Sequence, residues 1–290
     1  MTPRAIARSS WLRPTGALGR MRLGLLVSLI VLTGAAWWLT IHHALSMSMP
    51  MGIALRGGTA ADGMSGMAMA GIAATGWSIG GAVVFTAMWT VMMAAMMLPA
   101  TAPMVLIFAS AHARGGQSAG VSTWIFIAGY ILVWAAVGFL VYAVVQVGSD
   151  VATSLASTER STWAPLALGA TLAMAGLYQF TPLKRACLSH CRSPLAFVAQ
   201  HWRAGRIGAL AMGLKHGAYC LGCCWALFAV MVAAGVMSLA WMLLLTLIVF
   251  VEKVLPHGPR VGAATGVALT ALGIVVAMGV VPMPWLVQAH

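Results

Sequence analysis

Residues 215–225 read Lys-His-Gly-Ala-Tyr-Cys-Leu-Gly-Cys-Cys-Trp and open a long apolar segment of the chain. On an α-helix, side chains three and four positions apart lie on the same face. His216, Cys220, Cys223 and Cys224 are therefore expected to form one stripe. Thiolates and imidazoles are ligands that soft and borderline transition metals prefer. The stretch predicts a helix that carries a metal-binding face.

The whole chain has the composition of a membrane protein. Of its 290 residues, 61% are hydrophobic and only 7% are charged, whereas soluble domains carry roughly a quarter charged residues. Apolar runs long enough to cross a bilayer recur along the sequence. They are continuous and do not alternate with a period of two, which favours helices over a barrel. We expect an all-α, polytopic transmembrane helix bundle.

The apolar runs divide the chain into an N-terminal arm and one helical domain. Residues 1–22 form a basic arm, and residues 23–290 form the helical domain, with a Met- and His-rich external loop at 42–76. The first run follows a basic leader, but it is long enough to span and no small-residue cleavage site ends it, so we expect an uncleaved span. Seven spans are predicted, at about residues 23–41, 77–109, 121–147, 163–180, 207–234, 237–251 and 261–281.

The net charge of +12 is better explained by the basic residues that set the orientation of membrane spans than by nucleic-acid binding. Basic residues lie before the first span and after the second, fourth and sixth, so the positive-inside rule predicts a cytoplasmic N-terminus and an external C-terminus. The chain has few oxygen ligands for Mg²⁺ or Ca²⁺, because its only acids are Asp62, Asp150, Glu159 and Glu252. No paired carboxylates, phosphate loop or Ser-His-Asp set is present, so an enzyme is not expected.

A second group of cysteines follows the fourth span. Thr181 and Pro182 predict the start of a short helix, on which Cys187, His190 and Cys191 share a face. Disulfides are rare on the reducing cytoplasmic side, where clustered thiols bind metals or do redox work, although buried cysteine also serves as a packing residue. The CxxxC and CxxCC spacings are not those of zinc fingers. They favour copper(I), with zinc as the second possibility.

Methionine is the other unusual residue, with 21 copies in the chain. Within the second span, thioethers four residues apart form two adjacent stripes, which are either core packing or a path for a soft ion. These are Met88, Met92 and Met96, and Met93 and Met97. The external loop resembles the methionine clusters that collect copper(I) outside bacterial cells, unless it is low-complexity sequence. Its candidate ligands are His42, His43, Met47, Met49, Met51, Met64, Met67 and Met69.

Several motifs together resemble a known bacterial family. They are residues 88–99 (MWTVMMAAMMLP), 178–184 (YQFTPLK), Cys187, 191–194 (CRSP), 216–225 (HGAYCLGCCW) and 252–253 (EK). The family is a domain of unknown function labelled predicted metal-binding integral membrane protein, and the similarity covers about residues 80 to 260. The resemblance implies a bacterial inner-membrane protein that binds a metal. From the residues alone, Glu252 and Lys253 are expected only to end a helix.

The favoured hypothesis is a membrane protein that binds copper(I) for transport, delivery or sensing. Its partners would be the lipid bilayer and a metallochaperone or membrane complex, and not nucleic acid. One alternative is a thiol-redox protein that uses Cys223 with Cys224, or Cys220 with Cys187. The other is an assembly subunit of a membrane complex, in which the cysteines only pack.

Overall fold

The computed structural model describes residues 16–46, 77–114, 119–154, 157–234 and 239–279. Its regular structure is entirely helical over these residues, which confirms the all-α prediction. The helices are α2 (Ala17–Ser46), α4 (Ile79–Arg114), α5 (Ala119–Ser154), α6 (Ser157–Tyr178), α7 (Pro182–Arg192), α8 (Pro194–His201), α9 (Gly205–Ala234), α10 (Leu239–Val254) and α11 (Gly258–Ala277).

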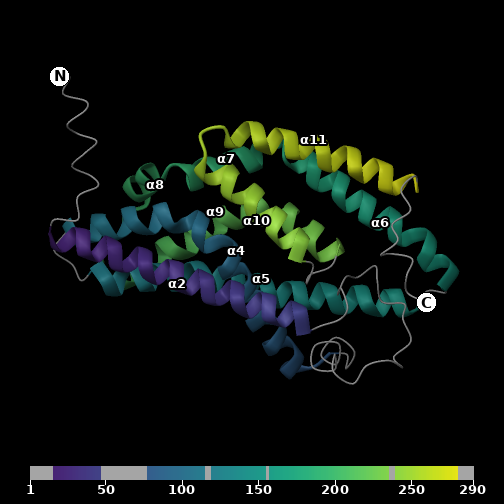
Figure 1. The fold of residues 1–290 in the computed structure, drawn as a ribbon, viewed down its shortest axis with the longest axis horizontal. Helices are drawn as coiled ribbons and strands as arrows, with labels where there is room; N and C mark the ends of the chain where they lie inside the picture. The colour runs from purple at the N-terminus through teal and green to yellow at the C-terminus, as the bar shows by residue number, and fades with distance from the viewer. Residues whose placement is uncertain (1–15, 47–76, 115–118, 155–156, 235–238, 280–290) are drawn as a thin grey trace.

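The long helices run back and forth along the long axis of the molecule (Figure 1). Helix α6 packs along α11, α5 packs along α9, and α4 lies against both α2 and α5. Helix α10 contacts α4, α9 and α11. The short helices α7 and α8 join α6 to α9, and α7 packs on α9. This arrangement brings α7, α9 and α10 together around one part of the core.

Five of the described helices are long and apolar enough to cross a membrane, namely α2, α4, α5, α9 and α11. Helices α6 and α7 form a bent pair that raises the number to six if the pair is one span. Helix α10 has 16 residues and is shorter than a typical membrane-spanning helix of about 20 residues. Seven spans therefore remain a prediction.

The helices extend beyond the predicted spans at several points. The segment 148–162 was expected to be a loop, but α5 continues to Ser154 and α6 begins at Ser157. Helix α2 likewise continues through His42 to Ser46. Apolar runs mark the part of a helix that is suited to lipid, and polar residues can continue the same helix beyond it. The methionines of the external loop and the side chain of His43 lie outside the described residues.

The break between α6 and α7 is as the sequence predicts. The side chain of Thr181 accepts a hydrogen bond from the backbone N–H of Lys184 at 3.3 Å, and Pro182 is the first residue of α7. Proline at this position costs no hydrogen bond, because the first N–H groups of a helix have no partner within it. The two helix axes differ in direction by 63°. The bend turns α7 toward α9.

Glycines allow α5 and α9 to approach closely. A Cβ atom on Gly129 would lie 2.6 Å from the carbonyl oxygen of Leu210, and one on Gly213 would clash with the carbonyl oxygen of Phe126. Small residues at such contacts are typical of helices that pack backbone against backbone. The close approach places Tyr130 of α5 beside the cysteines of α9.

Candidate functional site

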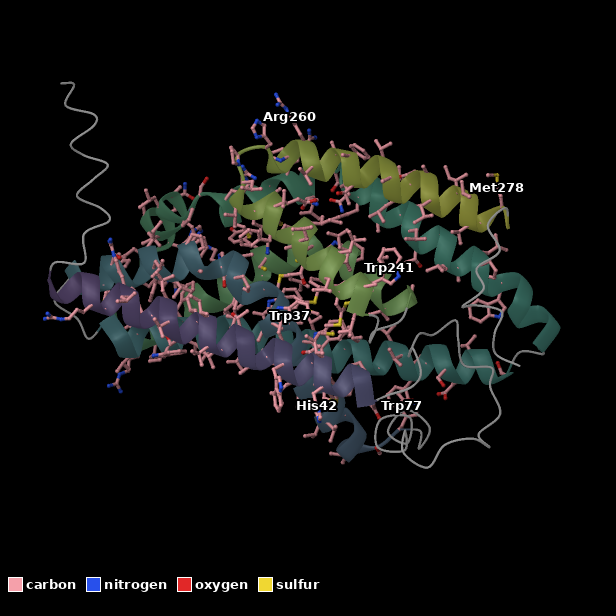
Figure 2. All side chains as sticks on the ribbon, viewed as in Figure 1. Trp37, His42, Trp77, Trp241, Arg260 and Met278 are labelled. Atoms are coloured by element: carbon pink, nitrogen blue, oxygen red, sulfur yellow. The ribbon has the colours of Figure 1, made fainter. Side chains whose placement is uncertain are left out.

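The cysteines of α9 face the interior of the bundle. Cys220, Cys223 and Cys224 are at most 2% exposed. Helix α7 brings Cys187 and Cys191 to the same region, where both are half-buried and pack against the core. Figure 2 shows sulfur atoms gathered in the middle of the bundle beside α10. We call these five residues the cysteine cluster.

Packing contacts join the cysteines of the two helices. Cys187 and Cys191 of α7 pack against the core cluster that contains Cys220, Cys223 and Cys224. A Cβ atom on Gly222 would lie 2.6 Å from the Cys187 sulfur, so this thiol rests directly on the α9 backbone. The structure thus brings together cysteines that are separated by some thirty residues of sequence.

The thiols are nevertheless not arranged as a ready metal site. Cys223 and Cys224 donate to the backbone carbonyl of Cys220 at 3.1 Å and 2.7 Å between sulfur and oxygen. Nowhere in the described ranges do three His, Cys, Asp or Glu side chains stand so that they could hold a metal ion between them. Cys223 and Cys224 would give up these bonds to the backbone on ligating a metal.

A lysine that the sequence reasoning assigned only to a helix end lies at the centre of the cluster. The ammonium nitrogen of Lys253, on α10, is 2.8 Å from the Cys220 sulfur and 3.8 Å from the Met97 sulfur. The Tyr130 hydroxyl lies 3.1 Å from the same Cys220 sulfur. Cys220 is thus contacted by one cationic and one neutral hydrogen-bonding group.

A second buried lysine ties α7 to α10. Lys184 forms an ion pair with Glu252 at 2.7 Å and also donates to the side-chain carbonyl of Gln179. Arg192, at the end of α7, donates to the backbone carbonyls of Glu252 and Pro256. Removing one partner of a buried ion pair is costly, because the other charge is left uncompensated. These contacts tie the helix that carries Cys187 and Cys191 to the end of α10.

The predicted methionine stripes lie in the same core as the cysteines. Met92, Met93, Met96 and Met97 are at most 3% exposed and belong to one apolar cluster with the three cysteines of α9. Met88 is only partly buried. Met97 reaches the cysteine cluster through Lys253. The buried methionines of α4 therefore share one core with the cysteines of α9.

His216 is almost entirely buried beside the cysteine cluster. Its ring lies among aromatic rings, with centroid distances of 5.7 Å to Tyr130 and 5.4 Å to Phe197. Its Nδ1 atom has no hydrogen-bond partner. A buried polar atom without a partner calls for an explanation. A ligand role is one explanation that this position permits, since His216 precedes Cys220 by one helical turn.

His190 lies on the side of α7 that faces α9, where its ring contacts a tyrosine. Its ring stacks on that of Tyr219, with centroids 4.2 Å apart and an angle of 8° between the planes. It also lies near His201 of α8. Because Tyr219 belongs to α9, this imidazole lies against the same helix that Cys187 contacts at Gly222, at a position that also brings it near α8.

The comparisons with known proteins agree with a role that involves copper. Residues 86–276 match the model of a family described as PpoB2: Copper chaperone. The matched range begins in α4 and ends in α11, and it contains all five cysteines. No curated protein and no solved structure is detectably similar to the chain.

Proposed function

Because the chain belongs to the PpoB2 copper-chaperone family, we propose that it is an integral membrane protein that holds copper(I) in the cysteine cluster and delivers it to a partner protein. The observation that supports this most is the packing of α7 on α9, which brings Cys191 against the core that holds Cys220 and Cys223. Delivery fits the family description better than transport or sensing does.

Copper(I) suits the cluster better than zinc or a hard cation. Thiolates and thioethers are soft ligands that select copper(I), and all five cysteines are free. Structural zinc sites are four-coordinate and tetrahedral, whereas copper(I) accepts two or three ligands, and few thiols need to turn to bind it. Carboxylates are scarce here: Glu252 is the only acidic residue beside the cluster in the part of the chain that the structure describes, and it is paired with Lys184.

The residues of the cluster have different roles in this proposal. Cys220 and Cys223 are the core ligands, and Cys191 and Cys224 exchange with them as the metal enters or leaves. On loading, Cys223 and Cys224 give up their hydrogen bonds to the Cys220 carbonyl, and the metal takes the place of the lost contacts. Met97 and the other buried thioethers of α4 provide weaker ligands along a transfer path.

To test the proposed function, the protein is purified in detergent without oxygen and titrated with copper(I) against a chromophoric chelator. We expect at least one copper(I) per chain, with sulfur dominating its first coordination shell in X-ray absorption spectra. The loaded protein should pass copper(I) to an acceptor that has an empty thiol site. A protein that binds no copper(I), or binds it through nitrogen and oxygen alone, would contradict the proposal.

We further propose seven spans in a bacterial inner membrane, with the N-terminus in the cytoplasm. The start of α2, helices α7 and α8, and the start of α11 all lie in the same half of the molecule (Figure 1). This half carries most of the basic residues of the described chain, including Arg192, Arg203 and Arg260. A reporter enzyme that is active only outside the cytoplasm should be active when fused to the C-terminus. Activity only from an N-terminal fusion would reverse the orientation.

Thiol-redox chemistry is the second candidate, and the packing of Cys191 of α7 against the core that holds Cys223 of α9 is what favours it. These thiols lie on separate helices, so a disulfide between them would lock α7 to α9. Trapping of thiols in growing cells separates the two functions. A chaperone should show persistently reduced thiols, whereas a redox protein should cycle between a free and an oxidised pair.

A further inference from the structure

A pair of histidines lies beside the cysteine cluster, where α7 and α8 meet α9. The ring centroids of His190 and His201 are 6.2 Å apart. Both side chains are partly exposed, in contrast to the buried His216. His190 stacks on Tyr219, which directly precedes Cys220 in α9. The pair therefore lies at the accessible edge of the region that holds the cluster.

Hydrogen bonds orient both imidazoles for ligation. Nδ1 of His190 is bonded to the Ala186 carbonyl at 2.8 Å, and Nδ1 of His201 is bonded to the Phe197 carbonyl at 3.1 Å. A carbonyl oxygen only accepts, so each Nδ1 carries a proton, and Nε2 is the nitrogen that can offer a lone pair to a metal. Metal-bound histidines commonly donate their second N–H to a backbone carbonyl in this way.

The spacing of the rings also fits one shared metal ion. Two opposed imidazole nitrogens at about 2.0 Å from a common metal place their ring centroids about 6 Å apart. We propose that His190 and His201 form a second copper(I) site, bound through two Nε2 atoms and separate from the cysteine cluster. That the metal is copper(I) rests on the proposed function, whereas the imidazole geometry stands independently of it.

The position of this histidine pair suggests a handover step. Phe197 is buried, and its ring lies 4.9 Å from that of His201 and 5.4 Å from that of His216. His216 in turn lies one helical turn from Cys220. Imidazoles bind copper(I) less strongly than thiolates do, since nitrogen is the harder ligand. Copper(I) held at the surface pair can therefore pass inward to the sulfurs or outward to a partner.

To test the pair, all five cysteines are replaced by serine, and the purified variant is titrated with copper(I) without oxygen. We expect one copper(I) with micromolar affinity and a shell of two nitrogens in X-ray absorption spectra. Adding His190→Ala or His201→Ala should weaken this binding at least about tenfold. His257→Ala is the matched control, because that histidine is exposed at the start of α11, and it should change nothing.

The same histidine variants are also measured with the native cysteines, in case the serine variant does not fold. In the protein that keeps its cysteines, the double variant His190→Ala/His201→Ala should bind one copper(I) ion fewer per chain. The sulfur-bound ion should stay in place. The second site would be overturned if the double histidine variant bound as many copper(I) ions as the wild-type protein. It would also be overturned if the histidine substitutions left nitrogen-bound copper(I) undiminished in the variant without cysteines. If the wild-type protein binds no copper(I) through sulfur, the proposed function is overturned instead.

Discussion

Replacement of Cys220, Cys223 and Cys224 together by serine is expected to abolish copper(I) binding at the cysteine cluster. Serine has the same shape as cysteine with a slightly smaller side chain and can still donate to the backbone carbonyl at position 220, so the helix should fold. A hydroxyl is a hard, weakly coordinating ligand, and the loss of three sulfurs should lower copper(I) affinity by at least about 1,000-fold. The chelator competition described above measures this change directly.

Cys187→Ser provides the comparison for that experiment. Cys187 is half-buried and contacts α9 at Gly222, at the edge of the cluster. Its loss should weaken binding by no more than about tenfold, since the core ligands remain. Thermal unfolding of the metal-free proteins should agree within about 5 °C. Unaltered affinity in the triple variant would favour the assembly-subunit alternative, in which these cysteines only pack.

The sequence was sufficient to predict the helical class and the shared helical face of the α9 cysteines, whereas the meeting of the α7 and α9 cysteines is known only from the structure. Long apolar runs specify helices through length and composition alone, and the capping pair Thr181 and Pro182 located the start of α7. The spacing of Cys220, Cys223 and Cys224 placed them on one face, and all three are buried. The helical spacing of these cysteines depends only on their positions in the sequence, so their shared face can be predicted without knowing which helices pack against α9.

What the sequence could not predict depends on contacts between distant helices. Lys253 reaches Cys220 because α10 packs beside α9, and no local pattern encodes that approach. His190 stacks on Tyr219 of α9, and the spacing of residues on α7 could not show which side chain of another helix its ring would contact. The one available signal for Lys253 was a charged pair at the end of an apolar helix in a chain with only four acids.

Replacement of Lys253 by methionine is expected to weaken copper(I) binding about 100-fold, which equals about 2.8 kcal/mol. A copper(I) ion bound by two thiolates carries one net negative charge, and a buried charge is costly unless it is compensated. The Lys253 ammonium is 2.8 Å from the Cys220 sulfur. Opposite charges 4 Å apart attract by about 4 kcal/mol at an effective dielectric constant of about 20.

The neighbouring charges leave Lys253 as the group best placed to compensate the complex. Lys184 is engaged by Glu252 in an ion pair whose members are each 3% exposed. The Tyr130 hydroxyl donates or accepts a hydrogen bond but is neutral. Methionine at position 253 would fill similar space and add a thioether, so a loss of affinity could not be attributed to a missing ligand.

Two variants separate the charge of Lys253 from its packing. Lys253→Arg keeps the positive charge and should retain affinity within about tenfold of the wild-type protein. Lys215→Met removes an exposed lysine from α9 and should leave affinity unchanged. If the ammonium instead competes with copper(I) for the Cys220 sulfur, Lys253→Met will bind copper(I) more tightly than the wild-type protein. Tighter binding would show that Lys253 blocks the metal-free site. A counter-charge that stabilises bound copper(I) predicts the opposite, namely weaker binding when Lys253 is replaced.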